Sequence, residues 1–320
     1  MEPTMPTLLT EAPPEEAPVS APARVNQPPR RSWSDRTFGF VLLSPAIALI
    51  LLVAVVPIGL AIYFSLHATS YLEVRDFVGF ENFQKMFADE RFANSLGASL
   101  KYVLGSLVLA FGIALPLAAS LVNGGKAIST IRAIIFLPWV ISQVVTALLW
   151  VWILNPSFGP VAEILRSVGI APIDALSSPS SAMVLLIVAN VWASYPLATV
   201  LLLAAMQSVP DELYDAAAVD GCGPWKSFIH VTLPSIRSAL GMTAINLTVY
   251  YFNMVTLIYT MTGGGPLRST EVLSLRIYLE AFQNNQLASA SAYGVIALLL
   301  NIAFAAAYIR VLRSSAEKGA

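Results

Sequence analysis

"DELYDAAAVDGCGPWKSFIHVTLP", residues 211–234, decides how this chain is organised, because it separates two long segments that carry no charge. Its first five residues include three acids, Asp211, Glu212 and Asp215. Ser208, three residues before Asp211, predicts a capped helix start, where the helix dipole favours negative charge. Gly221 is typical of the left-handed residue that ends a helix. A second short helix is expected from Pro224 to Phe228.

The composition around this stretch is that of a membrane protein. The 320 residues are 57% hydrophobic and only 12% charged, and the mean hydropathy is +0.71. Soluble domains carry about 25% charged residues, so lipid is expected to surround most of the chain. The net charge of -1 disfavours a nucleic-acid partner. The single cysteine, Cys222, excludes an intrachain disulfide.

Charged residues mark out the membrane-spanning segments. Six stretches without Asp, Glu, Lys or Arg each exceed the roughly 20 residues that a helix needs to cross the hydrocarbon core. A helix satisfies its own backbone hydrogen bonds, which lipid cannot do. The sequence therefore predicts an all-α integral membrane protein with six spans, at about 39–66, 100–122, 133–154, 182–207, 238–260 and 286–309.

The remaining segments complete the predicted domain map. Residues 1–37, rich in Pro, Ala and Glu, are expected to form a disordered tail, because such a composition buries too little apolar surface to fold. Residues 38–312 form the membrane domain, which includes the loop 208–236, and residues 313–320 form a second tail.

The distribution of basic residues predicts the orientation. With six spans, both termini lie on the same side as the loop 208–236. That side carries Arg24, Arg30, Arg31, Arg36, Lys126, Arg132, Lys226, Arg237, Arg310, Arg313 and Lys318, eleven of the eighteen Lys and Arg residues. The positive-inside rule therefore favours a cytoplasmic location for the loop and both termini.

The segment 67–99, on the opposite side, contains regularly spaced phenylalanines. Phe77, Phe80, Phe83 and Phe87 share one helical face. This spacing favours an amphipathic helix lying along the outer membrane interface. A plain connecting loop is the alternative.

The opening stretch resembles the EAA loop of ATP-binding-cassette importer permeases, whose pattern is Glu-Ala-Ala, then Gly, then Ile-x-Leu-Pro. The matching positions are Asp215, Ala216, Ala217, Gly221, Val231, Leu233 and Pro234. Asp215 replaces the usual Glu and Val231 the usual Ile. "NPSFGP" (155–160), "YP" (195–196) and "TGGGP" (262–266) look like sugar-importer permeases of the maltose and glycerol-phosphate type. The resemblance covers about 38–312.

This resemblance implies a fold and a set of partners. The fold is that of the type I ABC importer permease, with residues 211–222 as the coupling helix. One permease forms half of the translocation pathway in a bacterial inner membrane, beside a second, different permease, two ATPase subunits and an extracytoplasmic sugar-binding protein. The residues expected to couple to the ATPase are Asp211, Glu212, Asp215, Ala216, Ala217, Gly221, Leu233 and Pro234.

The chain itself is not expected to be an enzyme or to hold a cofactor. It contains no G-x-x-x-x-G-K-[ST] nucleotide motif, so the resemblance assigns ATP and Mg to the partner ATPase subunits. His, Cys, Asp and Glu show no zinc-ligand spacing either.

Polar residues within two spans are candidates for the substrate pathway. In the fifth span, Asn246, Tyr250 and Asn253 follow at i, i+4 and i+7, on one side of a helix, and Tyr251 lies beside them. In the fourth, Asn190 and Ser194 lie one turn apart. Asn and Tyr offer sugars hydrogen bonds and ring stacking without charge. The alternative is that such residues only join helices within the membrane. Gln143, in the third span, is a weaker candidate.

The resemblance implies roles for some of the same positions. In similar sugar permeases, the positions matching Asn190, Ser194, Tyr250 and Tyr251 line a pocket at mid-membrane. Three further pocket positions are apolar here, at Ala193, Leu197 and Leu247. A smaller pocket, or one with shifted polar contacts, is therefore expected.

Other functions fit parts of the sequence. An ion-coupled secondary transporter usually needs an ionisable group within the membrane, and no such residue lies in the middle of a predicted span. A membrane scaffold or sensor would not need the polar stripe. A permease for a polyol or for glycerol phosphate remains open, because these residues do not specify the substrate.

Overall fold

The computed structural model describes residues 35–70, 73–122, 127–172 and 174–317. The chain divides into two compact units, Met1–Val53 and Ala54–Ala320. In the first unit, α1 (Asp35–Ile50) begins within the predicted tail 1–37, whose residues 1–34 lie outside the described part. The large apolar side chains of α1 are exposed, as is typical of a helix surrounded by lipid.

Four helices of the described residues are long and apolar enough to cross a membrane. They are Phe38–Ser65, Glu90–Leu121, Pro179–Gln207 and Leu287–Arg310. They correspond to the predicted spans one, two, four and six. The second, α4 (Glu90–Leu121), begins ahead of the predicted residue 100, because the Asp89 carboxylate accepts a hydrogen bond from the Arg91 backbone N–H (2.9 Å) and caps the first turn.

The third predicted span, 133–154, is bent rather than straight. α5 (Ala127–Val140) and α6 (Gln143–Ile153) meet at an angle of 93°. Pro138 lies in the last turn of α5, where it removes a backbone donor and crowds the preceding turn. The bend follows at residues 141 and 142, so the prediction of one continuous helix is wrong here.

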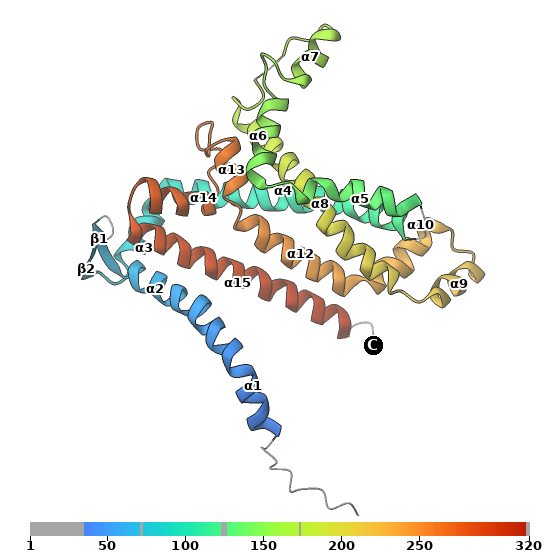
Figure 1. Ribbon diagram of the computed structural model, residues 1–320, viewed down its shortest axis with the longest axis horizontal. Coiled ribbons are helices and arrows are strands. Elements are labelled where there is room, and N and C mark those ends of the chain that lie inside the picture. Colours follow the sequence, from blue (N-terminus) through green and yellow to red (C-terminus); the bar gives the residue numbers. More distant parts are fainter. Residues whose placement is uncertain (1–34, 71–72, 123–126, 173, 318–320) are drawn as a thin grey trace, which may run out of the picture. The chain divides into compact units, whose positions relative to one another are not determined.

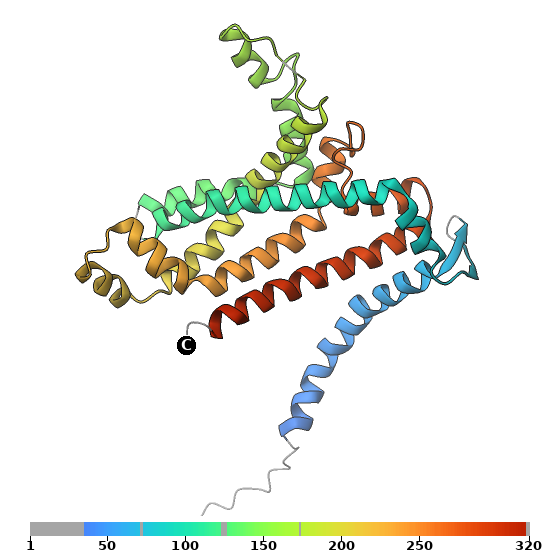
Figure 2. The same ribbon diagram turned by 180° about the vertical axis from the view of Figure 1, so that it is seen from behind.

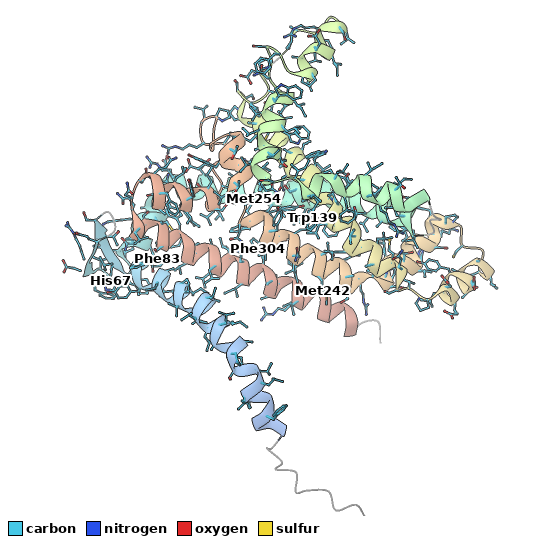
Figure 3. All side chains as sticks on the ribbon, in the orientation of Figure 1. His67, Phe83, Trp139, Met242, Met254 and Phe304 are labelled. Atoms are coloured by element: carbon cyan, nitrogen blue, oxygen red, sulfur yellow. The ribbon has the colours of Figure 1, made fainter. Side chains whose placement is uncertain are left out.

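The fifth predicted span, 238–260, is broken. α12 (Arg237–Phe252) has 16 residues, and α13 (Thr256–Met261) follows after a gap. The gap is supported from another element, since the Ser274 hydroxyl donates to the Met254 carbonyl oxygen (2.7 Å; Met254 is labelled in Figure 3). The described residues thus hold four apolar spans, or five if α5 and α6 count as one. The count of six stays a prediction.

The segment after the first span differs from the predicted amphipathic helix. It forms an antiparallel hairpin of β1 (His67–Ser70) and β2 (Glu73–Phe77), in which His67 pairs with Phe77. The helix that follows, α3 (Glu81–Ala88), is short. Phe77 ends β2, while Phe83 and Phe87 lie in α3. The fold is therefore mostly helical rather than all-α.

The core of the second unit lies between long helices. α4 packs along α8 (Pro179–Gln207), and Ala110, Ala114 and Ala118 of α4 are fully buried. Small residues one turn apart let two membrane helices approach closely. α15 (Leu287–Glu317) packs on α2 (Val56–Ser65) and α12, and its Phe304 meets Phe252 with ring centroids 5.8 Å apart (Figure 3). The helix α15 continues to Glu317, into the predicted tail 313–320.

The second unit has two distinct ends. Figures 1 and 2 show α4, α8, α12 and α15 side by side, with α9 (Asp211–Val219) and α10 (Pro224–Ser227) at one end. The hairpin, α3 and α14 (Leu273–Tyr278) lie at the other. The π-helical turn η3 (Leu279–Gln283) joins α14 to α15, and α7 (Pro160–Ser167) follows α6.

A buried arginine fastens the end that contains α14. The Arg276 guanidinium lies 2.5 Å from a Glu280 carboxylate oxygen, 3.2 Å from Glu271 and 3.9 Å from Asp89. Burial alone would lower the pKa of Arg276, but the carboxylates of Glu280 and Glu271 raise it above its usual value, so the group stays charged. Because Asp89 also caps α4, the network joins α14 to the start of α4.

Candidate functional site

The loop between α8 and α12 contains two short helices, as the sequence predicts. α9 ends at Val219, and Gly221, two residues further on, has a φ of +74°. The Cys222 N–H donates to the Ala217 carbonyl oxygen (2.9 Å) and the Gly221 N–H to that of Ala218 (3.0 Å). These paired bonds form a Schellman motif, which satisfies the last carbonyls of a helix and requires a left-handed residue. The predicted role of Gly221 as the left-handed residue that ends a helix is confirmed.

The predicted start of α9 is wrong in one respect. Ser208 does not cap α9; its hydroxyl donates to the Ala205 carbonyl oxygen (2.7 Å) at the end of α8. Pro210 occupies the position before the first residue of α9. The last carbonyls of a helix lack partners within the helix, and the serine hydroxyl satisfies one of them.

The surface of this loop is acidic and apolar at once. Of the predicted coupling residues, Ala217 is buried and Leu233 half-buried, while the exposed ones are Asp211, Glu212, Asp215, Ala216, Gly221 and Pro234. Two large apolar side chains between them are unusually exposed, Val219 at 88% and Trp225 at 72%. Exposed apolar groups among charges mark an interaction surface.

One hydrogen bond ties the two halves of the loop together. The Tyr214 hydroxyl lies 3.0 Å from the Thr232 hydroxyl. Thr232 ends the π-helical turn η2 (Phe228–Thr232), which continues through α11 (Leu233–Ser235) toward α12. α9 is therefore attached to the segment that leads directly into a membrane helix.

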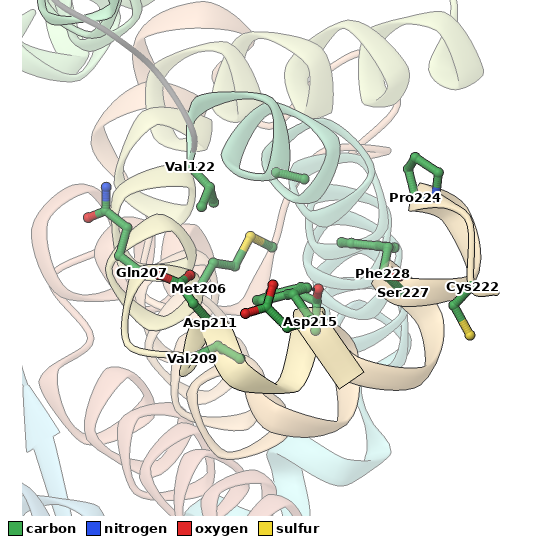
Figure 4. A pocket seen from close by; sticks show the side chains of 13 residues that line it. Val122, Met206, Gln207, Val209, Asp211, Asp215, Cys222, Pro224, Ser227 and Phe228 are labelled. Carbon is green, nitrogen blue, oxygen red and sulfur yellow. Dashed lines mark hydrogen bonds between the residues drawn. The ribbon is translucent and has the colours of Figure 1, made fainter. Parts of the chain in front are cut away.

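A cavity of about 900 Å³ lies between the loop and the ends of α4 and α8 (Figure 4). Asp211 and Asp215 line it from α9, Phe228 from η2 and Met206 from α8. The loop therefore stands partly clear of the helix ends, and both carboxylates border this open space.

Three of the predicted pathway residues are buried between helices. The Asn190 amide donates to the Ser106 hydroxyl of α4 (3.1 Å). The Ser194 hydroxyl lies 2.8 Å from that of Tyr251 on α12. Asn190, Ser194 and Tyr251 thus hold α8 against α4 and α12.

The other three pathway residues lie on an exposed face of α12 and just past its last residue. Asn246, Tyr250 and Asn253 are all exposed, and the Gln143 side-chain amide donates to the Tyr250 hydroxyl (2.8 Å). Gln143 is the first residue of α6, directly after the bend, so the bend brings this weaker candidate to the polar face. Its Oε1 has no hydrogen-bond partner within the described ranges.

A further tyrosine was missed by the sequence reasoning. Tyr102 of α4 is fully buried, and its ring lies edge-on to that of Tyr251, with centroids 6.5 Å apart. Its hydroxyl has no partner among the residues that the structure describes. The available signal was its place one turn before Ser106 on the buried stripe of α4.

The two neighbouring tyrosines of α12 should respond differently to loss of the hydroxyl. Tyr251→Phe removes a buried bond between helices and should lower the free energy of unfolding by about 0.6 to 1.7 kcal/mol. Tyr250→Phe should cost less, because Tyr250 is 37% exposed. Denaturant titration of the full chain in detergent compares them. A larger loss for Tyr250→Phe would contradict this division into buried and exposed groups.

Comparisons with known proteins identify the architecture. Residues 110–314 match the family model described as binding-protein-dependent transport system inner membrane component. The trehalose/maltose transport system permease protein MalF of Thermococcus litoralis is 28% identical over 88% of this chain and 95% of its own length. The sulfoquinovosyl glycerol transport system permease protein SmoG of Agrobacterium fabrum is 31% identical over 88% and 92%.

The fold also matches a solved structure. A chain of a bacterial alginate ABC transporter, crystallised in complex with alginate pentasaccharide-bound periplasmic protein, superimposes with a TM-score of 0.74. The match covers 87% of this chain and 96% of that chain at 23% identity. The fold is that of an ABC importer permease. The chain belongs to the family of inner membrane components of binding-protein-dependent transport systems, so the predicted membership of the importer permeases is confirmed. The assignment of residues 211–222 as a coupling helix stays a prediction.

Proposed function

We propose that this chain is a permease subunit of an ATP-driven importer of a sugar or sugar derivative. It forms half of the translocation pathway, next to a second permease chain, and receives its substrate from an extracytoplasmic binding protein. Relatives named for trehalose/maltose and sulfoquinovosyl glycerol transport support the substrate class. The loop and both termini face the cytoplasm, as the distribution of Lys and Arg favours.

The exposed loop carries this proposal. Val219 and Trp225 present apolar surface beside the acids of α9, and this pairing fits a basic, partly apolar cleft of an ATPase subunit. Charge complementarity selects the partner, while aromatic side chains supply contact energy. ATP and Mg then belong to the two ATPase subunits of the complex.

The loop is built to move as a unit. The Schellman motif fixes the end of α9, and the Tyr214–Thr232 bond ties α9 to η2. When ATP binding closes the ATPase pair, the displaced loop pulls on the segment that leads into α12. The motion therefore reaches the face that carries Asn246, Tyr250 and Asn253.

The polar groups on and behind this face form the proposed substrate pathway. Asn246, Tyr250 and Asn253 are exposed and offer amides and a ring to a polyhydroxylated solute. Gln143 orients the Tyr250 hydroxyl. Behind this face, the hydrogen bonds of Asn190, Ser194 and Tyr251 hold α8 against α4 and α12.

Co-purification and uptake test the proposal directly. The full chain, expressed with its neighbouring transport subunits, should co-purify with an ATPase subunit. Vesicles that contain the complex and the loaded binding protein should take up sugar only with ATP inside the compartment that faces the loop. Uptake that follows a proton or sodium gradient without ATP would refute the assignment.

Reversing one charge on α9 should disconnect the ATPase. Asp215→Lys places a cation where a basic cleft is expected and should weaken ATPase co-purification by about tenfold or more, because like charges that face each other across an interface cost several kcal/mol. Asp215→Glu, the residue usual in the resembling loops, should retain binding. Asp76→Lys, on the exposed strand β2, is the matched control. Full binding by Asp215→Lys would exclude this contact.

A further inference from the structure

Three aromatic rings form a continuous row of tilted contacts away from the loop and from the proposed pathway. The rings belong to Tyr259 of α13, Tyr278 of α14 and Phe282 of η3. The Tyr278 ring lies 5.1 Å from that of Tyr259 and 5.2 Å from that of Phe282, centroid to centroid. Phe282 is 72% exposed. α14 lies at the end of the second unit remote from α9 and α10 (Figures 1 and 2).

A run of four amide side chains follows Phe282, the last of these rings. Gln283, Asn284, Asn285 and Gln286 are all exposed. The Gln283 amide donates to the Tyr259 hydroxyl (3.2 Å), which holds the run against the rings. Backbone bonds from Asn284 to Leu279 (2.9 Å) and from Gln286 to Glu280 (2.8 Å) fix the turn. The run 281–286 is therefore ordered and carries no charge of its own, and Glu280, the acid that precedes it in the sequence, is buried against Arg276.

We propose that Tyr259, Tyr278 and Phe282, with the amides of 283–286, form a contact site for a neutral carbohydrate. Aromatic rings bind the C–H faces of sugars, and amides both donate to and accept from sugar hydroxyls. The absence of charge between residues 281 and 286 selects a neutral ligand. The proposal rests on the proposed function, because it gives the same substrate an earlier contact on the side opposite the coupling loop.

The amides argue against lipid as the occupant. A phenylalanine that only contacts hydrocarbon needs no polar neighbours, and burying an amide in hydrocarbon without a partner costs several kcal/mol. Four exposed amides directly after Phe282 therefore place this surface in water or at its boundary. A docked protein is the remaining occupant, and the experiment separates it from a sugar.

A fluorophore placed beside the rings can report binding there alone. Cys222→Ser removes the only cysteine of the chain. In the same chain, Asn284→Cys introduces a single thiol that carries an environment-sensitive label. The full-length chain in lipid nanodiscs is then titrated with maltose as the probe. We expect a saturable change. Phe282→Leu should weaken the apparent affinity about threefold to tenfold, the effect of one aromatic contact, and Phe282→Trp should restore it.

Matched controls keep the result specific. Phe158→Leu alters an aromatic ring that is equally accessible, at 67% exposure, and should leave the titration unchanged. The site would be overturned if the label on the chain that keeps Phe282 did not respond to maltose. It would also be overturned if Phe282→Leu left the apparent affinity for maltose unchanged. A Phe282→Leu chain that keeps the sugar response but loses capture of the loaded binding protein would overturn it as well, because the surface would then dock a protein.

The two proposals fail in different ways. ATP-dependent uptake by the wild-type complex, together with a label that ignores maltose, would remove this contact site and leave the importer assignment standing. A label that responds to maltose in a complex that shows no ATP-dependent uptake would refute the importer assignment and leave the contact site standing.

Discussion

Gly221→Pro should reduce ATP-driven uptake by at least about tenfold while the membrane helices remain folded. Gly221 has a φ of +74°, whereas proline fixes φ near −65°. Proline also removes the N–H that donates to the Ala218 carbonyl oxygen. The end of α9 must therefore rearrange, at a cost of about 3 kcal/mol or more, and the loop loses the geometry with which it meets the ATPase.

The loop supplies its own control. Gly223 has a φ of −73°, and a Cβ added there meets no atom within 4 Å. Gly223→Ala should therefore transport normally. Uptake is measured in vesicles of equal permease content, and circular dichroism checks that helicity is retained. Full uptake by Gly221→Pro would show that the conformation of this turn does not matter for coupling.

Arg276→Ala should lower the free energy of unfolding by about 3 to 5 kcal/mol. Arg276 is 5% exposed, and its removal leaves the buried carboxylates of Glu271 and Glu280 without a countercharge. The loss arises from these unpaired charges more than from the missing attraction. Denaturant titration of the full chain in detergent measures it.

Two comparisons test this explanation. Arg268 lies 3.9 Å from Glu271 but its side chain is 51% exposed, so Arg268→Ala should cost no more than about 1 kcal/mol. Combining Arg276→Met with Glu271→Gln and Glu280→Gln removes all three charges and should recover part of the lost stability. An equal loss in Arg268→Ala and Arg276→Ala would contradict the role of burial.

Much of the fold could be predicted because lipid excludes charge. Stretches without charge located the helices that begin or end near 65, 121, 207 and 287. The interruptions were harder to predict, since they depend on neighbouring elements. The gap after α12 is supported by Ser274, which lies far along the chain from Met254. The bend after Pro138 had a local signal, but proline is often tolerated within membrane helices.

The candidate site shows the same limit in finer detail. Helical periodicity placed Asn246, Tyr250 and Asn253 on one face, and the structure keeps them together and exposed. Periodicity alone could not distinguish Tyr250 from Tyr251. The two are adjacent in sequence but differ in burial, because successive side chains on a helix point in different directions. The contact between Gln143 and Tyr250 could not be predicted from periodicity, because it depends on the bend between α5 and α6.

The shortness of α12 has a consequence for insulation. Sixteen residues rise about 24 Å, less than the roughly 30 Å of the hydrocarbon layer. Irregular backbone at that depth is tolerated only inside protein or next to water, and Asn253 at the gap is exposed. We therefore expect water to reach Asn253. The low-dielectric layer that separates the two aqueous compartments is then thinner along α12 than in the surrounding bilayer. A solute that crosses here travels a shorter distance without its hydration water.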